Sequence, residues 1–169
     1  MTVSLASPLV AELEAEAAAT RRLLEAVPQD KLTWAPHPKS MTLGQLALHV
    51  AEIPGSISGF LEIDEFDVET TNFEAAQPDS HAAILEKLDG SLAAGRERLA
   101  ALTDEAALSN WKLTKGGAEL FSIPKIGLAR NLLFNHLYHH RGQLTVYLRL
   151  LDVPVPVVYG RTADVNPFA

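Results

Sequence analysis

The sequence predicts an all-α fold: a four-helix bundle with a long connection between helices 2 and 3, a small hairpin-like excursion before helix 4 and an extended C-terminal tail. Apolar residues recur at helical spacing in four segments, and prolines and glycines fall between these segments. The chain has 169 residues, of which 47% are hydrophobic and 21% are charged, as is usual for one globular domain. We therefore expect a single domain, residues 1–169, that does not need a metal in order to fold.

The first predicted helix begins with a serine and a proline. Ser7 is placed as the cap and Pro8 as the first helical residue, and the Ala/Leu/Glu-rich run continues to Val27 and ends at Pro28. Further prolines then predict a loop around Trp34.

Thr42 is the expected cap of the second helix. Pro54 lacks the backbone N–H that would bond to the Val50 carbonyl, so we expect this helix to end or kink just past His49. The helix carries an apolar stripe next to His49, formed by Leu43, Leu46, Val50 and Ile53.

The segment of residues 56–79 is acidic and is predicted to be an irregular crossover or lid, because it is too long for a tight turn. A third helix is expected from Ser80 to about Leu102. Its apolar positions are Ile84, Leu85, Leu88, Leu92 and Leu99.

Two short extended pieces around Gly-Gly, within residues 111–121, predict a small hairpin. The fourth helix should then run from about Pro124 to Leu151. The prolines of residues 153–159 cannot continue it, so an extended tail should lie on the bundle. The inward stripe of this last helix consists of Leu133, Leu137, Leu144, Leu148 and Leu151.

Charge and composition exclude several classes of partner and chemistry. The net charge of −7 and the lack of a basic stripe argue against nucleic acid, and no stretch has the apolar length that spans a bilayer. A secretory signal begins with a positively charged region, but this sequence has no Lys or Arg before Arg21. We therefore expect a cytoplasmic protein. The absence of cysteine excludes thiolate ligands and a cysteine nucleophile.

Three histidines form the candidate site. His136 and His140 are four residues apart, about 40° around a helix, so both can bind one metal ion. His49 can join them if the second and fourth helices pack together. Such a pair also occurs by chance, and a lone histidine is more often an ordinary core residue, but the three together favour a metal site with at least one open coordination position.

Neighbouring residues could support these ligands. Glu52, one turn beyond His49, is a candidate acceptor for a ligand's second ring nitrogen, although a solvated residue is the commoner role there. His139 points away from the other two and is assigned a supporting or surface role. Gln143 could orient a ligand or substrate, and Arg141 should point away and bind the tail or a carboxylate.

These motifs together resemble the DinB-like (DinB/YfiT) superfamily of four-helix metalloproteins. The resemblance includes four helical segments, a histidine near the end of the second, the motif His-x-x-His-His-Arg-Gly-Gln-Leu over residues 136–144, Trp34 before its prolines, and the closing Val-Pro-Val-Pro-Val-Val-Tyr-Gly of residues 153–160. It implies one divalent metal, most often nickel or zinc, held by the histidines that match His49, His136 and His140. It also implies a homodimer.

The resemblance implies a metal-dependent enzyme acting on a small molecule. Thiol-dependent S-transfer with a metal-activated thiolate is the leading expectation, with a low-molecular-weight thiol as co-substrate. A metal-dependent hydrolase is one alternative, because a metal also lowers the pKa of water. A noncatalytic, stress-associated protein that binds a ligand or partner is the other.

Overall fold

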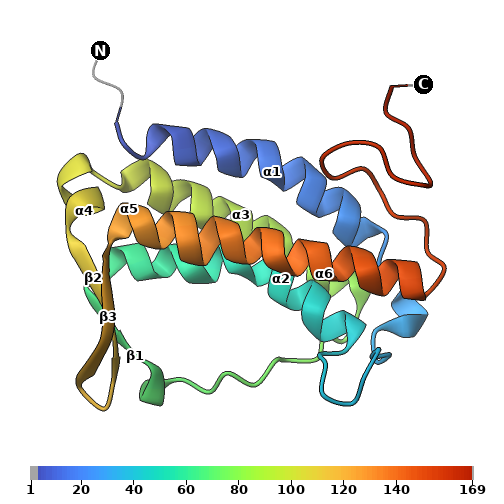
Figure 1. Cartoon of the computed structure of the whole chain (residues 1–169), viewed down its shortest axis with the longest axis horizontal. Coiled ribbons are helices and arrows are strands. Elements are labelled where there is room, and N and C mark those ends of the chain that lie inside the picture. The colour runs from blue at the N-terminus through green and yellow to red at the C-terminus, as the bar shows by residue number, and fades with distance from the viewer. Residues whose placement is uncertain (1–3, 169) are drawn as a thin grey trace.

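Four long helical segments packed side by side make up most of the computed structural model, which describes residues 4–168 (Figure 1). α3 contacts both α1 and α2, and α6 contacts the same two helices, so the four segments enclose a common core. The prediction of a mainly helical protein is confirmed. The segments are α1 (Ser7–Glu25), α2 (Leu43–Gly59), α3 (His81–Ala101) and a last continuous one composed of α5 (Lys125–Leu128), the π-helical η4 (Ala129–Asn135) and α6 (His136–Leu150).

A three-stranded sheet at one end of the bundle corrects the all-α prediction. Its strands are β1 (Glu65–Asp67), β2 (Asn110–Lys115) and β3 (Ala118–Pro124), in the order β1-β2-β3. β2 and β3 form the predicted hairpin, and β1 pairs with β2 in parallel. A strand of three residues is too short to show an alternating pattern, and its pairing partner is distant in the sequence, so the sequence alone did not indicate it.

The hairpin turn is held against β1 by one carboxylate. Gly116 and Gly117 both have positive φ, +57° and +80°, as a two-residue hairpin turn requires. The Asp67 side chain accepts hydrogen bonds from their backbone N–H groups, at 3.2 and 3.0 Å. These bonds, together with one from the Glu69 backbone, lower the pKa of Asp67. The end of β1 is therefore fixed to the hairpin, which follows the short helix α4 (Asp104–Leu108).

The second helix continues past Pro54 to Gly59, so of the two expectations, an end or a kink, the end was wrong. The Ser91 hydroxyl of α3 bonds to backbone groups on both sides of the proline. It accepts from the Gly55 N–H at 2.8 Å and donates to the Glu52 carbonyl at 3.0 Å. The helix can therefore pass through the proline because a neighbouring helix satisfies its backbone.

Of the two predicted caps, Thr42 is confirmed and Ser7 is not, and Ser80 is a further cap that was not predicted. Thr42 accepts from the Gln45 N–H in a capping box, and Ser80 accepts from the Ala83 N–H. Ser7 is not a cap, because α1 begins one residue earlier than predicted and the Ser7 hydroxyl bonds to that of Ser4, at 2.9 Å.

The segment of residues 56–79 is more regular than predicted. After the end of α2 come two short 3₁₀ turns, η2 (Phe60–Glu62) and η3 (Val68–Thr70), on either side of β1. Apart from Ile63 and Asp64, only residues 71–80, here called the connecting strap, have no helix or strand. The strap runs along α2 towards the start of α3 (Figure 1), and the Gln45 side chain donates to the Ala75 carbonyl, at 2.9 Å.

The core contains the predicted apolar stripes. The stripe residues of α2 and the leucines at 133, 137, 144 and 148 are buried, whereas Leu151 is half-buried. The C-terminal tail has no regular structure, as expected, and Val155 anchors it in the core. Within residues 4–168, no helix is both long and apolar enough to cross a membrane.

Candidate metal centre

Three histidine side chains from two helices converge on one point. His49 Nε2 lies 3.2 Å from His136 Nε2. The His140 ring centroid lies 4.5 Å from each of the other two. One ring nitrogen from each residue lies within 4.8 Å of the other two nitrogens, and all three side chains are half-buried. The structure therefore brings together the three residues that were predicted as ligands.

The apolar stripes of α2 and α6 explain this convergence. His136 and His140 occupy successive turns of α6, beside Leu137 and Leu144, which are buried. His49 lies on the face of α2 next to the buried Val50, and α2 packs against α6. Packing of the two apolar stripes thus brings the imidazoles together.

A π-helical segment directly precedes the histidine pair. η4 spans Ala129–Asn135, immediately before His136. Such segments are rare and often occur at functional sites. The Leu132 backbone, inside η4, acts to raise the pKa of His136, against the larger lowering by burial. No sequence pattern predicted this segment.

The environment keeps the three imidazoles neutral. Burial, followed by repulsion from His140 and His136, lowers the pKa of His49 from 6.5 to about 4. Burial also lowers the pKa values of His136 and His140. Since a histidine binds a metal only through a deprotonated nitrogen, the set is ready for ligation at neutral pH.

The geometry fits a divalent ion. Two nitrogens at 2.0–2.1 Å from a tetrahedral Zn²⁺ are separated by about 3.3 Å. The 3.2 Å between the His49 and His136 nitrogens agrees with this separation. Three neutral imidazoles leave at least one further coordination position, which is typical of catalytic rather than structural zinc sites.

The neighbouring residues differ in whether they contact the cluster. The Gln143 carbonyl oxygen lies 2.7 Å from His140 Nδ1 and can accept its N–H. Glu52 instead forms an ion pair with Lys87, at 3.4 Å, and has no hydrogen bond to His49 in the described structure. His139 is exposed on the outer face of α6, with its ring centroid 4.8 Å from that of His140.

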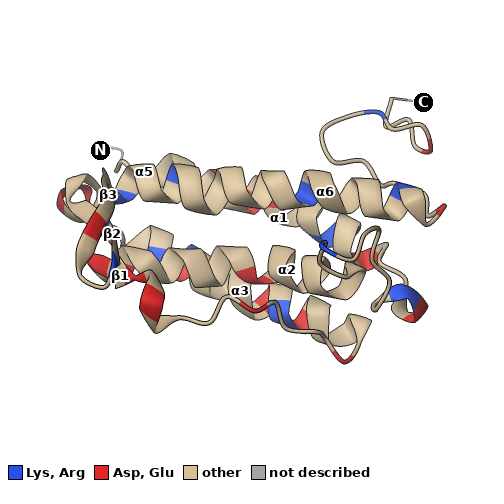
Figure 2. Ribbon diagram, turned by 60° about the horizontal axis from the view of Figure 1, so that its bottom comes forward, with Lys and Arg blue, Asp and Glu red and all other residues tan. Residues whose placement is uncertain are grey.

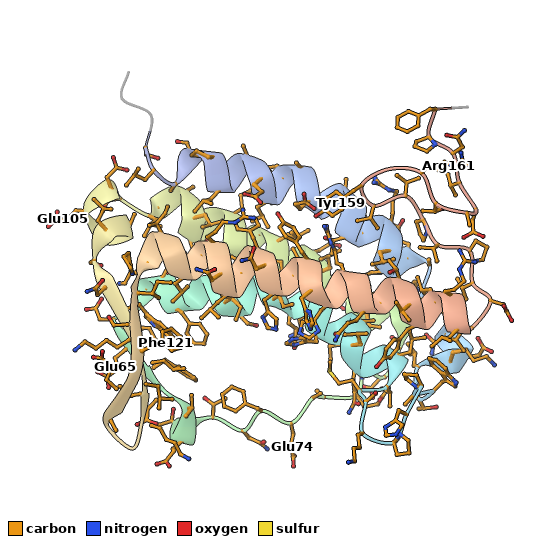
Figure 3. The ribbon with its side chains drawn as sticks, in the orientation of Figure 1. Glu65, Glu74, Glu105, Phe121, Tyr159 and Arg161 are labelled. Carbon is orange, nitrogen blue, oxygen red and sulfur yellow. The ribbon has the colours of Figure 1, made fainter. Side chains whose placement is uncertain are left out.

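Arg141 points away from the cluster, as predicted, and binds both a carboxylate and the tail. It is buried and forms an ion pair with Glu16 of α1, at 2.6 Å. It also donates to the hydroxyls of Thr20 and Tyr159. Figure 3 shows Tyr159 where the tail reaches α1.

A pocket of about 690 Å³ opens beside the histidines, between α2 and the connecting strap. His49 and His136 line it, together with Glu52 and apolar residues of α2. Sequence analysis missed its aromatic wall, although the acidic segment contains three phenylalanines that could have suggested one. These are Phe60, Phe66 and Phe73.

A second pocket, of about 650 Å³, lies between α2 and α3. It is lined by small residues and by Glu86, Lys87 and Arg98, and it contains none of the three clustered histidines. The first pocket is therefore the one associated with the candidate site.

Comparisons with known proteins agree with this architecture. The model of the DinB family matches residues 1–166. A DinB-like protein of Bacillus subtilis superposes with a TM-score of 0.70 at 16% sequence identity, covering 92% of this chain and 100% of its own. A DinB-like protein of Bacillus cereus superposes with a TM-score of 0.61 at 27% identity, covering 86% and 92%. No curated protein matches the chain.

Proposed function

Because this chain belongs to the DinB family, we propose that it is a metal-dependent enzyme that acts on a small molecule. One observation carries the proposal: three half-buried, neutral histidines lie beside a pocket of about 690 Å³. A pocket of this volume suits a small-molecule substrate.

Transfer of a low-molecular-weight thiol is the leading reaction. A bound divalent ion lowers the pKa of a thiol or of a water molecule, which is the chemistry that thiol transfer and hydrolysis require at neutral pH. In the transfer, the thiol sulfur, having lost its proton, forms a bond to an electrophilic carbon, and the leaving group departs with the bonding electrons. The chain itself has no cysteine, so the thiol must be a co-substrate.

The residues of the site have distinct roles in this proposal. His49, His136 and His140 hold the ion, nickel or zinc, and α2 and α6 fix their geometry. Gln143 orients the His140 ring through its 2.7 Å contact. The apolar residues of the pocket exclude water from the reacting groups.

Metal analysis combined with a turnover assay tests the proposal. The purified protein should contain one equivalent of a divalent metal and should convert an electrophile in the presence of a low-molecular-weight thiol. His49→Ala and His136→Ala should each lose the metal and the activity. His139→Ala is the matched control, since it removes an exposed histidine from the same helix, and it should keep both.

Other outcomes support other functions. Stoichiometric metal with turnover of esters or amides, but not of thiols, would identify a hydrolase. A protein without metal, whose histidine variants bind ligands like the wild type, would be a noncatalytic binding protein. We also propose a homodimer, as the family resemblance implies, and a monomeric mass in light scattering would contradict it.

A further inference from the structure

Three phenylalanines from separate segments line the pocket beside the histidines. Phe60 follows α2, Phe66 lies on β1 and Phe73 lies on the connecting strap. The Phe60 and Phe66 ring centroids are 4.7 Å apart. Phe60 also packs on the buried Trp111, at 5.6 Å, so this part of the lining is supported from behind.

Phe73 differs from the other two because 69% of it is exposed. The strap that carries it is fixed on both sides. β1 and η3 precede it, and further along the chain the Gln77 side chain donates to the Leu32 carbonyl, at 3.2 Å. Phe73 is therefore a large apolar side chain held at the pocket with much of its surface still in water. An apolar ligand would remove that surface from water.

The side chains that line the pocket are acidic or neutral, although Glu52 is paired with Lys87 of α3. Among the described residues, its lining includes no lysine or arginine. The connecting strap has none either, as the colouring of Figure 2 shows. Glu52 lines the pocket, and the side chain of Glu74 points away from α2 (Figure 3). Away from the histidines, nothing in the lining would balance an anionic group.

We propose that Phe60, Phe66 and Phe73 form a subsite for an aromatic or similarly apolar part of the substrate. That part is uncharged or carries an amine, and it is not a carboxylate or phosphate. Phe73 covers the bound group and is a specificity-determining residue. The role of the subsite in a reaction rests on the proposed function. Binding of the apolar group to the phenylalanines does not require the metal.

Three ligands of similar shape and different charge test the subsite: 4-phenylbutan-1-ol, 4-phenylbutylamine and 4-phenylbutyrate. They are titrated into the full chain while the backbone amide shifts of the strap are followed by NMR. The same titrations are made with His140→Ala. His140 does not line the pocket, so the variant keeps the lining intact. It removes a proposed metal ligand, so that a carboxylate cannot bind merely by coordinating an ion.

The alcohol and the amine should bind both proteins equally well and shift the amides of the strap. 4-Phenylbutyrate should bind His140→Ala about tenfold more weakly than the alcohol does, because its carboxylate is desolvated without a cation. Phe73→Ala should weaken binding of the alcohol by about tenfold, through the lost aromatic contact. Phe168→Ala removes a phenylalanine that is 83% exposed in the tail and should change nothing.

Equal affinity of the alcohol and 4-phenylbutyrate for His140→Ala would overturn the charge selectivity. Unchanged binding in Phe73→Ala, or shifts confined to another surface, would overturn the subsite itself. The results with the alcohol depend neither on metal content nor on turnover, so failure of the subsite and failure of the proposed enzyme are distinguishable.

Discussion

The orientation of the His140 ring depends on a single amide side chain. Gln143 lies one turn further along α6, and its carbonyl oxygen is 2.7 Å from His140 Nδ1. When Nδ1 carries the proton, Nε2 has a free lone pair. Gln143 therefore selects the tautomer in which His140 can bind a metal through Nε2.

Replacing Gln143 should weaken metal binding without removing a ligand. Gln143→Leu deletes the acceptor and should raise the Kd for zinc about tenfold, measured by competition with a chelating indicator. Gln143→Glu keeps an acceptor oxygen and should retain wild-type affinity or improve it. Identical affinities for Gln143→Leu and the wild type would show that the amide does not set the ring orientation.

Helical spacing allowed His136, His140 and Gln143 to be predicted from the sequence, because residues three and four apart share one face of a helix. His49 could be added only on the condition that the two helices pack together. The same reasoning suggested Glu52 as a hydrogen-bond partner of His49, but a lysine of α3 pairs with it instead. Spacing within one helix cannot reveal a competing charge on another helix. The phenylalanine wall was missed because its residues come from short turns, a strand and a strap, which have no common period.

At the scale of elements, α2 and α3 approach closely around Pro54. A Cβ added to Gly95 of α3 would lie 2.9 Å from the Pro54 carbonyl oxygen, a backbone atom that cannot easily move. The hydroxyl of Ser91, one turn earlier, bonds to the backbone on both sides of the proline. The close approach is what allows α2 to remain helical past its proline.

Two glycines of α3 should therefore respond oppositely to alanine. Gly95→Ala should lower the free energy of unfolding by about 1–3 kcal/mol, because the added methyl group collides with α2. Gly90→Ala should raise it by about 0.5–1 kcal/mol, since nothing lies within 4 Å of the new Cβ and alanine favours helix. Urea denaturation measures both, and a stabilising Gly95→Ala would contradict the close contact.

The periodic elements were predictable, and the exceptions depended on contacts between distant segments. The stripes of α2, α3 and the last helix follow from the sequence because most of their apolar residues are buried. The Ser91 hydroxyl of α3 supports α2 where it continues past Pro54. β1 forms only through its parallel pairing with β2, in which Glu65 lies opposite Lys112. Neither partner can be identified from local sequence.

At the scale of the whole molecule, Arg141 connects α6, α1 and the C-terminal tail. Its guanidinium pairs with Glu16 and bonds to the Tyr159 hydroxyl, while stacking over the rings of Tyr138 and Tyr159 at 5.1 Å. Tyr138 in turn bonds to Glu12 of α1. The side of α6 that faces away from the histidine cluster is thereby attached to the rest of the bundle.

Arg141→Ala should destabilise the whole chain by about 3–5 kcal/mol, because it leaves the largely buried Glu16 carboxylate without a cationic partner. Arg149→Ala is the control, since that arginine also binds the tail, through Asp164, but is exposed. It should leave the thermal midpoint nearly unchanged. Equal losses in the two variants, measured by calorimetry, would show that burial of Arg141 gives it no special role.

The most direct test of the three-histidine centre is anomalous scattering from crystals grown with zinc or nickel, recorded on both sides of the metal's absorption edge. We expect one anomalous peak, about 2.1 Å from a ring nitrogen of each of His49, His136 and His140. A peak bound by other residues, or a metal-saturated crystal with no peak between these rings, would contradict the account.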